Sequence, residues 1–310
     1  MQLTRLCQLA AALAFTAIVS FPGDAGDLGA AVSPPVRSVV LPTGGTTTAT
    51  TFATVINRTD SALGNCQVEL PGRYRDLQLD FAWTDPATNE LVPGSQNVPF
   101  SLGPRASQSL VLAFTADAAF DGVIPPVFEC SGGASADSLF GINTFELAVA
   151  ETAPADILAI GLTLSGDGVI RVAQPGGRQA FAIAAINIGA TDTVRIRPVG
   201  TYGQNADLPA QLTVCQTNAQ GQCMQPPASE LTLSFQSGAV HTFAVFAQAD
   251  GNFAIPLAPD TNRVELRFIT GQGLAAATSA AITAPGPDFR IGHARPCGWR
   301  SRQPSARTRR

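Results

Sequence analysis

The sequence predicts an all-β protein of two β-sandwich domains in tandem, which follow a signal peptide. Three observations predict it: apolar residues alternate with polar ones, turn-forming residues recur at short intervals, and a repeat relates the two halves. The chain has 310 residues, of which 45% are hydrophobic and 14% charged. This length allows two domains of about 100 to 150 residues, and the composition excludes a disordered chain.

The N-terminal segment 1–25 has the organisation of a signal peptide. Arg5 gives the start a positive charge, residues 6–21 are apolar, and Pro22 precedes Gly23 and Ala25, which suit cleavage after Ala25. A retained anchor is the alternative, but the apolar run is short for a membrane span and lacks a stop-transfer flank. We therefore expect export to the periplasm, the cell surface or the medium, with no membrane span in the mature chain.

After the predicted signal peptide, apolar residues tend to recur at every second position. In 77–83 and 264–268 apolar and polar residues alternate, as in antiparallel strands that are buried on one face. Turn-forming pairs separate such stretches: Pro71-Gly72, Pro93-Gly94, Asp121-Gly122, Asp167-Gly168 and Asp250-Gly251. Short strands with turns at intervals of about 8 to 12 residues are typical of sandwiches.

An internal repeat predicts that the two halves share one fold. The segment 79–117 aligns with 212–250 without a gap, and the apolar register is kept. Further towards the N-terminus, residues 55–57 resemble 185–187. We expect domain 1 at 38–150 and domain 2 at 156–284, with a short linker at 150–156 between them.

Four cysteines lie in the predicted domains, and an even number in an exported chain predicts disulfides. Cys215 and Cys223 bracket a turn-forming heptapeptide and are expected to close a hairpin loop, whereas Cys66 and Cys130 are expected to staple domain 1. Loop-closure entropy corresponds to about 2 to 3 kcal/mol for the short loop and about 4 kcal/mol for the long one. Zinc binding is the competing interpretation, but neither histidine lies near these cysteines in the sequence.

Residues 38–284 resemble the immunoglobulin-like sandwich domains of secreted bacterial proteins. The resemblance rests on the spacing of Cys66 and Cys130, with Trp83 between them. The resemblance implies a binding surface at the loops of one sandwich end or at an exposed strand edge. Antibody domains have a tyrosine two residues before the second cysteine, where this chain has Phe128 without the hydroxyl, and Trp83 lies further past Cys66 than in antibodies. Cys66 can therefore lie at the antibody position or on a later strand.

No motif assigns catalytic chemistry. The patterns G-x-S-x-G and H-E-x-x-H, the phosphate loop and the dinucleotide fingerprint are absent, and the chain has no lysine. His241 is expected at a core edge or on the domain surface, because no motif places an acid and a nucleophile beside it. A glycosidase carboxylate pair needs no sequence spacing, so a polysaccharide hydrolase is an alternative. Aspartates in predicted turns are better explained as caps of backbone amides, and none belongs to a calcium-loop motif: Asp85, Asp121, Asp167, Asp250 and Asp260.

The charge distribution argues against nucleic acid as a partner. All 19 basic residues are arginines, and residues 26–289 hold 11 of them against 22 acidic residues, a balance that repels phosphate backbones. Residues 285–310 are predicted to form a disordered basic tail. The expected function is an exported, non-enzymatic binding or adhesion module without cofactor or metal, whose partner is an envelope protein or a polysaccharide. A hydrolase, a carbohydrate-binding accessory protein and a structural spacer are the alternatives.

Overall fold

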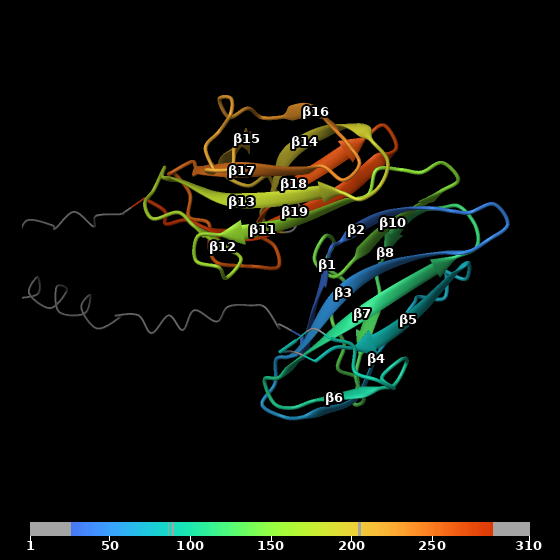
Figure 1. The fold of residues 1–310 in the computed structure, drawn as a ribbon. Helices are drawn as coiled ribbons and strands as arrows, with labels where there is room; N and C mark the ends of the chain where they lie inside the picture. The colour runs from blue at the N-terminus through green and yellow to red at the C-terminus, as the bar shows by residue number, and fades with distance from the viewer. Residues whose placement is uncertain (1–25, 86, 89, 204–205, 288–310) are drawn as a thin grey trace, which may run out of the picture. The chain divides into compact units, whose positions relative to one another are not determined.

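The structure is a computed structural model of the chain, and it describes residues 26–85, 87–88, 90–203 and 206–287. Regular structure in these residues consists of β-strands alone, which confirms the predicted all-β class (Figure 1). The chain divides between Ala153 and Pro154 into two compact units, called unit 1 and unit 2 below. The predicted signal peptide and most of the predicted basic tail lie outside the described residues.

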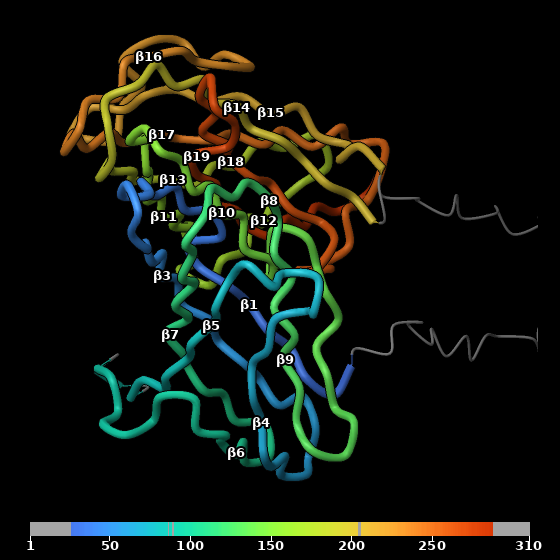
Figure 2. The backbone as a smooth tube through the Cα atoms, turned by 90° about the vertical axis from the view of Figure 1, so that its right-hand side faces the viewer, coloured from blue at the N-terminus to red at the C-terminus, as the bar shows by residue number. Residues whose placement is uncertain are grey.

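Unit 1 is a β-sandwich. One layer is a four-stranded sheet with the order β1-β3-β7-β5, and the other layer contains the strand orders β2-β10-β8 and β6-β4-β9. Figure 2 shows β4, β6 and β9 side by side. The strands are β1 (Leu28–Ser33), β2 (Val36–Val40), β3 (Thr47–Asn57), β4 (Leu63–Glu69), β5 (Leu77–Trp83), β6 (Phe100–Leu102), β7 (Ser107–Ala116), β8 (Phe120–Ile124), β9 (Val127–Glu129) and β10 (Phe145–Ala150).

Unit 2 has the same architecture. Its four-stranded sheet has the order β11-β13-β17-β15, and the second sheet has the order β12-β19-β18-β14-β16. The strands are β11 (Ile157–Thr163), β12 (Val169–Arg171), β13 (Arg178–Asn187), β14 (Asp192–Thr201), β15 (Ala210–Thr217), β16 (Leu231–Phe235), β17 (Val240–Ala249), β18 (Arg263–Thr270) and β19 (Gly273–Thr283).

The strand bounds follow the repeat that the sequence contains. The gap-free alignment of 79–117 with 212–250 places β7 on β17 with both ends coinciding, and it places β5 inside β15. In both units the second strand pairs in parallel with the last, β2 with β10 and β12 with β19. The two four-stranded sheets correspond to the A-B-E-D sheet of immunoglobulin domains. In unit 1, β8 and β9 together take the place of β18, because Pro125 and Pro126 interrupt the strand.

Unit 1 begins before residue 38, the predicted start of domain 1. β1 pairs with β3 in antiparallel fashion, and Leu28, Ala30 and Val32 are buried in the core. The predicted start lies after Pro34 and Pro35, which in the structure lie where the chain crosses from the first sheet to the second. The prolines therefore mark a change of sheet inside the unit.

Each unit has its own core between its two layers. In unit 1 the ring of Phe114 stacks on that of Phe145, with the ring centroids 4.5 Å apart. In unit 2 Phe268 makes edge-to-face contacts with Phe235 and Phe243. Pairs of this kind add to the free energy that comes from burial. No helix in the described ranges is long and apolar enough to cross a membrane.

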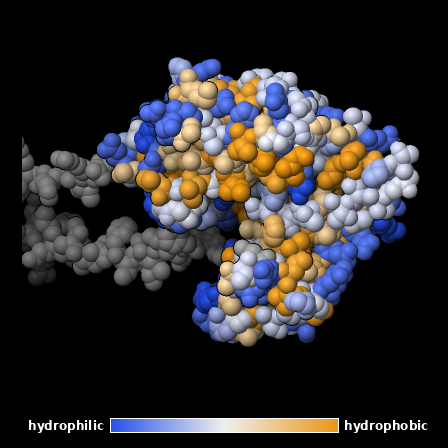
Figure 3. Space-filling model, in the orientation of Figure 1, coloured by the Kyte–Doolittle hydropathy of each residue, from blue (hydrophilic) through white to orange (hydrophobic). Residues whose placement is uncertain are grey.

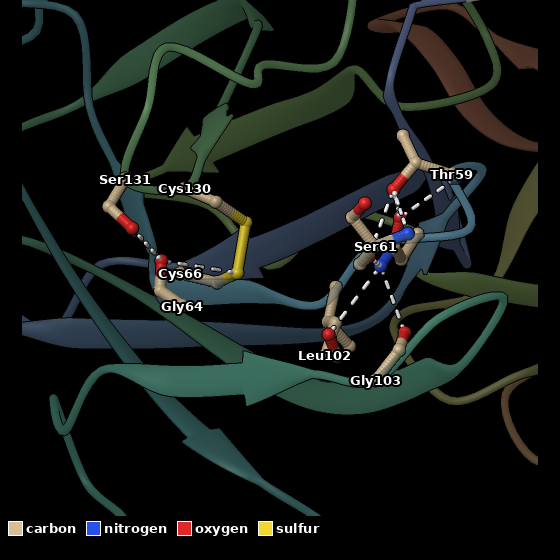
Figure 4. Close-up of a disulfide and its surroundings, with 9 residues drawn as sticks. Thr59, Ser61, Gly64, Cys66, Leu102, Gly103, Cys130 and Ser131 are labelled. Carbon is tan, nitrogen blue, oxygen red and sulfur yellow. Dashed lines mark hydrogen bonds between the residues drawn. A yellow bond between two sulfur atoms is a disulfide. The ribbon is translucent and has the colours of Figure 1, made fainter.

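The structure contains both disulfides, Cys66–Cys130 and Cys215–Cys223. Cys66 lies on β4 and Cys130 directly follows β9, and these two strands are neighbours in one sheet (Figure 4). The antibody disulfide joins two sheets. Of the two predicted positions for Cys66, the one on a later strand is therefore correct. The disulfide joins neighbouring strands of one sheet, whereas the sequence suggested a bond across the domain.

Candidate binding groove

A groove in unit 1 lies beside β5, on the outer face of the four-stranded sheet. Its volume is about 350 Å³, and mainly apolar groups line it. The floor comes from β5 and β7, and one wall comes from the segment 91–96. The lining residues are Asp80, Phe81, Ala82, Leu91, Val92, Pro93, Gly94, Ser95, Gln96, Val111 and Ala113.

The wall is held in place by hydrogen bonds to the edge of β5. The N–H of Val92 donates to the carbonyl of Trp83 at 3.0 Å, and the N–H of Asn97 donates to the carbonyl of Phe81 at 2.8 Å. The N–H of Phe81 in turn donates to Oδ1 of Asn97 at 2.9 Å. A tight turn at Pro93-Gly94, where Gly94 has a φ of 77°, lets the segment return along the strand. The edge of β5 is thus covered, and the groove opens above the sheet face.

The outer face of the sheet is apolar at the groove and beside it, because apolar side chains point outward from three strands. Phe52 on β3, Val111 on β7 and Ala82 on β5 are opposite one another in register, so they form one row across three strands. Phe52 is 52% exposed, and Leu91 at the wall is 59% exposed. Figure 3 shows hydrophobic residues gathered over β3 and β7. The apolar surface therefore extends from the groove across the sheet.

Carboxylates accompany this apolar surface. Asp80 lines the groove, where its Oδ1 accepts a hydrogen bond from Nδ2 of Asn97 at 2.7 Å and its Oδ2 accepts one from Nε2 of Gln78 at 3.1 Å. Asp85 and Glu90 lie on the segment that leads into the wall. Residues 26–153 hold 13 acidic residues and 5 arginines. A cationic ligand is therefore favoured over an anionic one near the groove.

The equivalent position in unit 2 is filled. In the aligned repeat Ala82 corresponds to Cys215, which is buried and bonded to Cys223, and Ala113 corresponds to Phe246. The guanidinium of Arg178 lies 4.1 Å from the ring centroid of Phe246. A smaller hollow of about 170 Å³ remains there, lined by Arg178, Gln211, Thr213, Pro227 and Gln248. The two units therefore share a fold but differ at this surface.

The structure separates the predicted site residues. Cys215 aligns with Ala82 of the groove and is bonded to Cys223, whereas Cys66 and Cys130 belong to the other layer of unit 1. His241 faces the core edge: its ring packs edge-to-face on Phe235, and its Nδ1 lies 2.9 Å from Nε2 of Gln216.

Two of the five predicted turn aspartates make the backbone contacts expected of caps. Oδ1 of Asp85 accepts from the N–H groups of Ala87 and Thr88, and Oδ1 of Asp167 accepts from the N–H of Val169. The hydrogen bond from the Ser165 hydroxyl holds the pKa of Asp167 below its ordinary value. The predicted turn at Asp121-Gly122 is wrong, because both residues lie inside β8, where Asp121 pairs with Ala148 of β10. Within the described ranges no group of three or more His, Cys, Asp or Glu side chains is placed to hold a metal ion.

No family model matches the chain, and no curated protein matches it either. Among solved structures, the secreted serine protease VesC from Vibrio cholerae aligns with 82% of this chain at 13% identity and a TM-score of 0.23. The chain spans about half of VesC, since the alignment covers 51% of that protein. The C-terminal domain of the antigen I/II polypeptide BspA from Streptococcus agalactiae aligns at 10% identity over 83% of this chain and 99% of that one, with a TM-score of 0.24. The major pilin subunit BcpA of Bacillus cereus aligns at 8% identity over 83% of this chain and 69% of that one, with a TM-score of 0.26. No functional argument rests on similarities of this size.

Sequence reasoning missed the groove, which lies on a sheet face rather than at a sandwich end or a bare edge. The return of residues 91–98 along β5 depends on contacts of Ser95 and Asn97 with a strand distant in the sequence. A signal was present in the repeat, however. At the aligned positions, Ala82 and Ala113 in one half are smaller than Cys215 and Phe246 in the other.

Proposed function

We propose that the protein is an exported, non-enzymatic binding module, and that the groove of unit 1 takes an extended, apolar and basic segment of an envelope protein. The main observation in support of this proposal is the groove. Its volume of about 350 Å³ is at the lower end of the range for ligand sites, which suits one or two side chains rather than a folded surface. The apolar row through Phe52, Val111 and Ala82 provides contact area along the rest of a segment.

Charge supports a basic partner, and the disulfides support export. Asp80, Asp85 and Glu90 would attract arginine or lysine side chains that flank an apolar anchor. Disulfides persist in oxidising compartments outside the cytosol, and the chain contains two of them. A segment of a periplasmic or surface protein meets both conditions better than a neutral or acidic polysaccharide.

Val111→Arg is expected to reduce partner capture at least tenfold. The new side chain occupies the floor of the groove with a positive charge, and a tenfold loss corresponds to about 1.4 kcal/mol. The measurement is affinity capture from native envelope extracts by the mature chain, with captured protein and glycan quantified by mass spectrometry.

The repeat provides a matched control. Ala244→Arg makes the same change at the equivalent register position on β17, so it should leave capture unchanged. Equal capture by wild type and Val111→Arg, with both proteins folded by circular dichroism, would refute the groove as the site. Recovery of a glycan as the ligand would refute the protein partner, and no ligand at all would favour the spacer.

A further inference from the structure

The outer face of the four-stranded sheet of unit 2 carries a row of long polar side chains. Arg178 on β13, Gln248 on β17 and Gln211 on β15 are opposite one another in register, so the row crosses three neighbouring strands (Figure 1). All three residues are exposed, whereas Ala247 and Ala249, which flank Gln248 in its strand, are buried. The row therefore points away from the core, and it is called the polar row below.

Two hollows adjoin the polar row, and mainly polar groups line both. One is the hollow of about 170 Å³ described above, and the other has a volume of about 380 Å³. Gln211 and Gln248 line both hollows, so the two are adjacent. The second hollow is lined by Pro209, Ala210, Gln211, Gln248, Ala249 and Asp250. This surface differs in chemistry from the apolar groove of unit 1.

The amide groups of the polar row are available to a ligand. The side chains of Gln211 and Gln248 make no hydrogen bond with the described part of the chain. The corresponding row of unit 1 consists of Thr48, Thr115 and Gln78. There the two threonine hydroxyls bond to each other at 2.9 Å, and the glutamine donates to Asp80 at 3.1 Å. The polar groups are thus paired with one another in unit 1 but not in unit 2.

The guanidinium of Arg178 is held in position but not neutralised. It stacks on the ring of Phe246, with its Cζ 4.1 Å from the ring centroid. Its Nη2 makes one long hydrogen bond of 3.5 Å, to Oγ1 of Thr213, and no carboxylate of the described residues forms an ion pair with it. Three other arginines of the unit are each paired with a carboxylate: Arg171, Arg195 and Arg267. The planar N–H donors of Arg178 therefore suit a carboxylate from outside the chain.

A sugar acid matches this combination of groups. Its carboxylate can accept two N–H donors of Arg178, and its hydroxyl groups both donate and accept, as the two amides do. An acidic peptide would supply the carboxylate with few hydroxyl groups. Its backbone would also find the neighbouring edge of β15 occupied, because Val214 exchanges two backbone hydrogen bonds with Ala228.

We propose that the polar row of unit 2 binds a uronic acid residue of an acidic polysaccharide. The carboxylate lies on Arg178, and the hydroxyl groups bond to Gln211 and Gln248. This site is separate from the groove of unit 1 and does not depend on the function proposed for the groove. A glycan bound here is captured equally by wild type and by Val111→Arg, whereas a ligand of the groove is not.

Isothermal titration calorimetry of the mature chain with trimers of galacturonic acid and of glucuronic acid tests the ligand class. At least one of the two should bind with a dissociation constant in the millimolar range or below. Trigalactose, which lacks the carboxylates, should bind at least tenfold more weakly. Triglutamate should do so too, and because its side chains carry the same charge as the uronates it also measures attraction by the arginines of the predicted tail. Failure of both uronates to bind, or equal binding of trigalactose or triglutamate, would overturn the proposal.

Substitutions within the polar row test its location. Arg178→Gln should weaken uronate binding at least tenfold, to the level of triglutamate, and Gln248→Leu should weaken it several-fold. Both residues are exposed, so circular dichroism should be unchanged. Arg197→Gln is the matched control, since Arg197 is an exposed arginine of the same unit on β14, in the other sheet, and it should leave binding unchanged. Unchanged binding by Arg178→Gln, or an equal loss in the two arginine variants, would overturn the proposal.

Discussion

Replacement of both Cys66 and Cys130 by alanine is expected to lower the free energy of unfolding of unit 1 by about 4 kcal/mol. The disulfide joins residues 64 positions apart, and closure of a loop of this length removes much conformational entropy from the unfolded chain. The loss is a large fraction of the total stability of an ordinary domain. Both residues are buried, so the double alanine variant also loses packing against Phe128 and its neighbours in the core cluster.

Trp83 allows the measurement to be made on unit 1 alone. The chain has two tryptophans, Trp83 and Trp299, so in a Trp299→Phe background the fluorescence reports the surroundings of β5. Urea unfolding followed by this signal should shift to lower denaturant. Replacement of Cys215 and Cys223 is the control, because it removes the shorter loop in unit 2 and should leave the Trp83 transition in place. An unchanged Trp83 transition in the Cys66/Cys130 variant would contradict the prediction.

Asn187→Leu is expected to destabilise unit 2 by about 3 to 5 kcal/mol. Asn187 is fully buried at the end of β13, and its Nδ2 donates to the carbonyls of Ala190 and Phe235 at 2.7 and 2.9 Å. Its Oδ1 accepts from the N–H groups of Gly189 and Asp156. Leucine has a similar volume but pairs with none of these groups, and each buried group left unpaired costs about 1 to 3 kcal/mol.

Far-UV circular dichroism during urea unfolding measures this effect, and the Trp83 transition of unit 1 should stay where it is. Asn252→Leu is the control, since Asn252 is exposed and contacts Asp250 in a turn, so the change should stay within about 0.5 kcal/mol. A destabilisation of Asn187→Leu no larger than that of the control would show that the buried amide is dispensable.

Unit 1 contains the same device. Asn57 ends β3, is fully buried, and donates through Nδ2 to the carbonyls of Ser61 and Gly103, which are labelled in Figure 4. Residues 55–57 therefore resemble 185–187 because both end in a buried asparagine whose side chain bonds to neighbouring backbone groups. We call this arrangement a clasp, and it recurs in both units. Each clasp ties the end of one strand to the loop that follows it and to the C-terminal end of the short strand β6 or β16.

The sequence predicted those features that depend on local pattern. Alternation predicted β5 and β18, because one face of each strand meets a core and the other does not. The gap-free repeat predicted the correspondence of β7 with β17, since both strands lie at the centre of equivalent sheets where insertions are not tolerated. Cysteine spacing predicted the two disulfide pairs.

Features that depend on distant contacts could not be predicted in this way. β1 lies before the predicted start of domain 1, because its pairing with β3 is not visible in a short run of apolar residues before two prolines. The placement of Cys66 in the same sheet as Cys130 depends on which strand it occupies, and spacing alone does not fix this. The groove likewise needs the hydrogen bonds of Asn97 to β5.

Photo-cross-linking from the rim of the groove tests the central claim most directly. Gln96 lines the groove and is exposed, and the equivalent residue in unit 2 is Ser229, which is exposed too. A photoreactive side chain at position 96 should form an adduct with an envelope protein, through a segment rich in apolar and basic residues, whereas the same group at position 229 should form none. Equal adducts from both positions, or none from position 96 in a folded protein, would contradict the account.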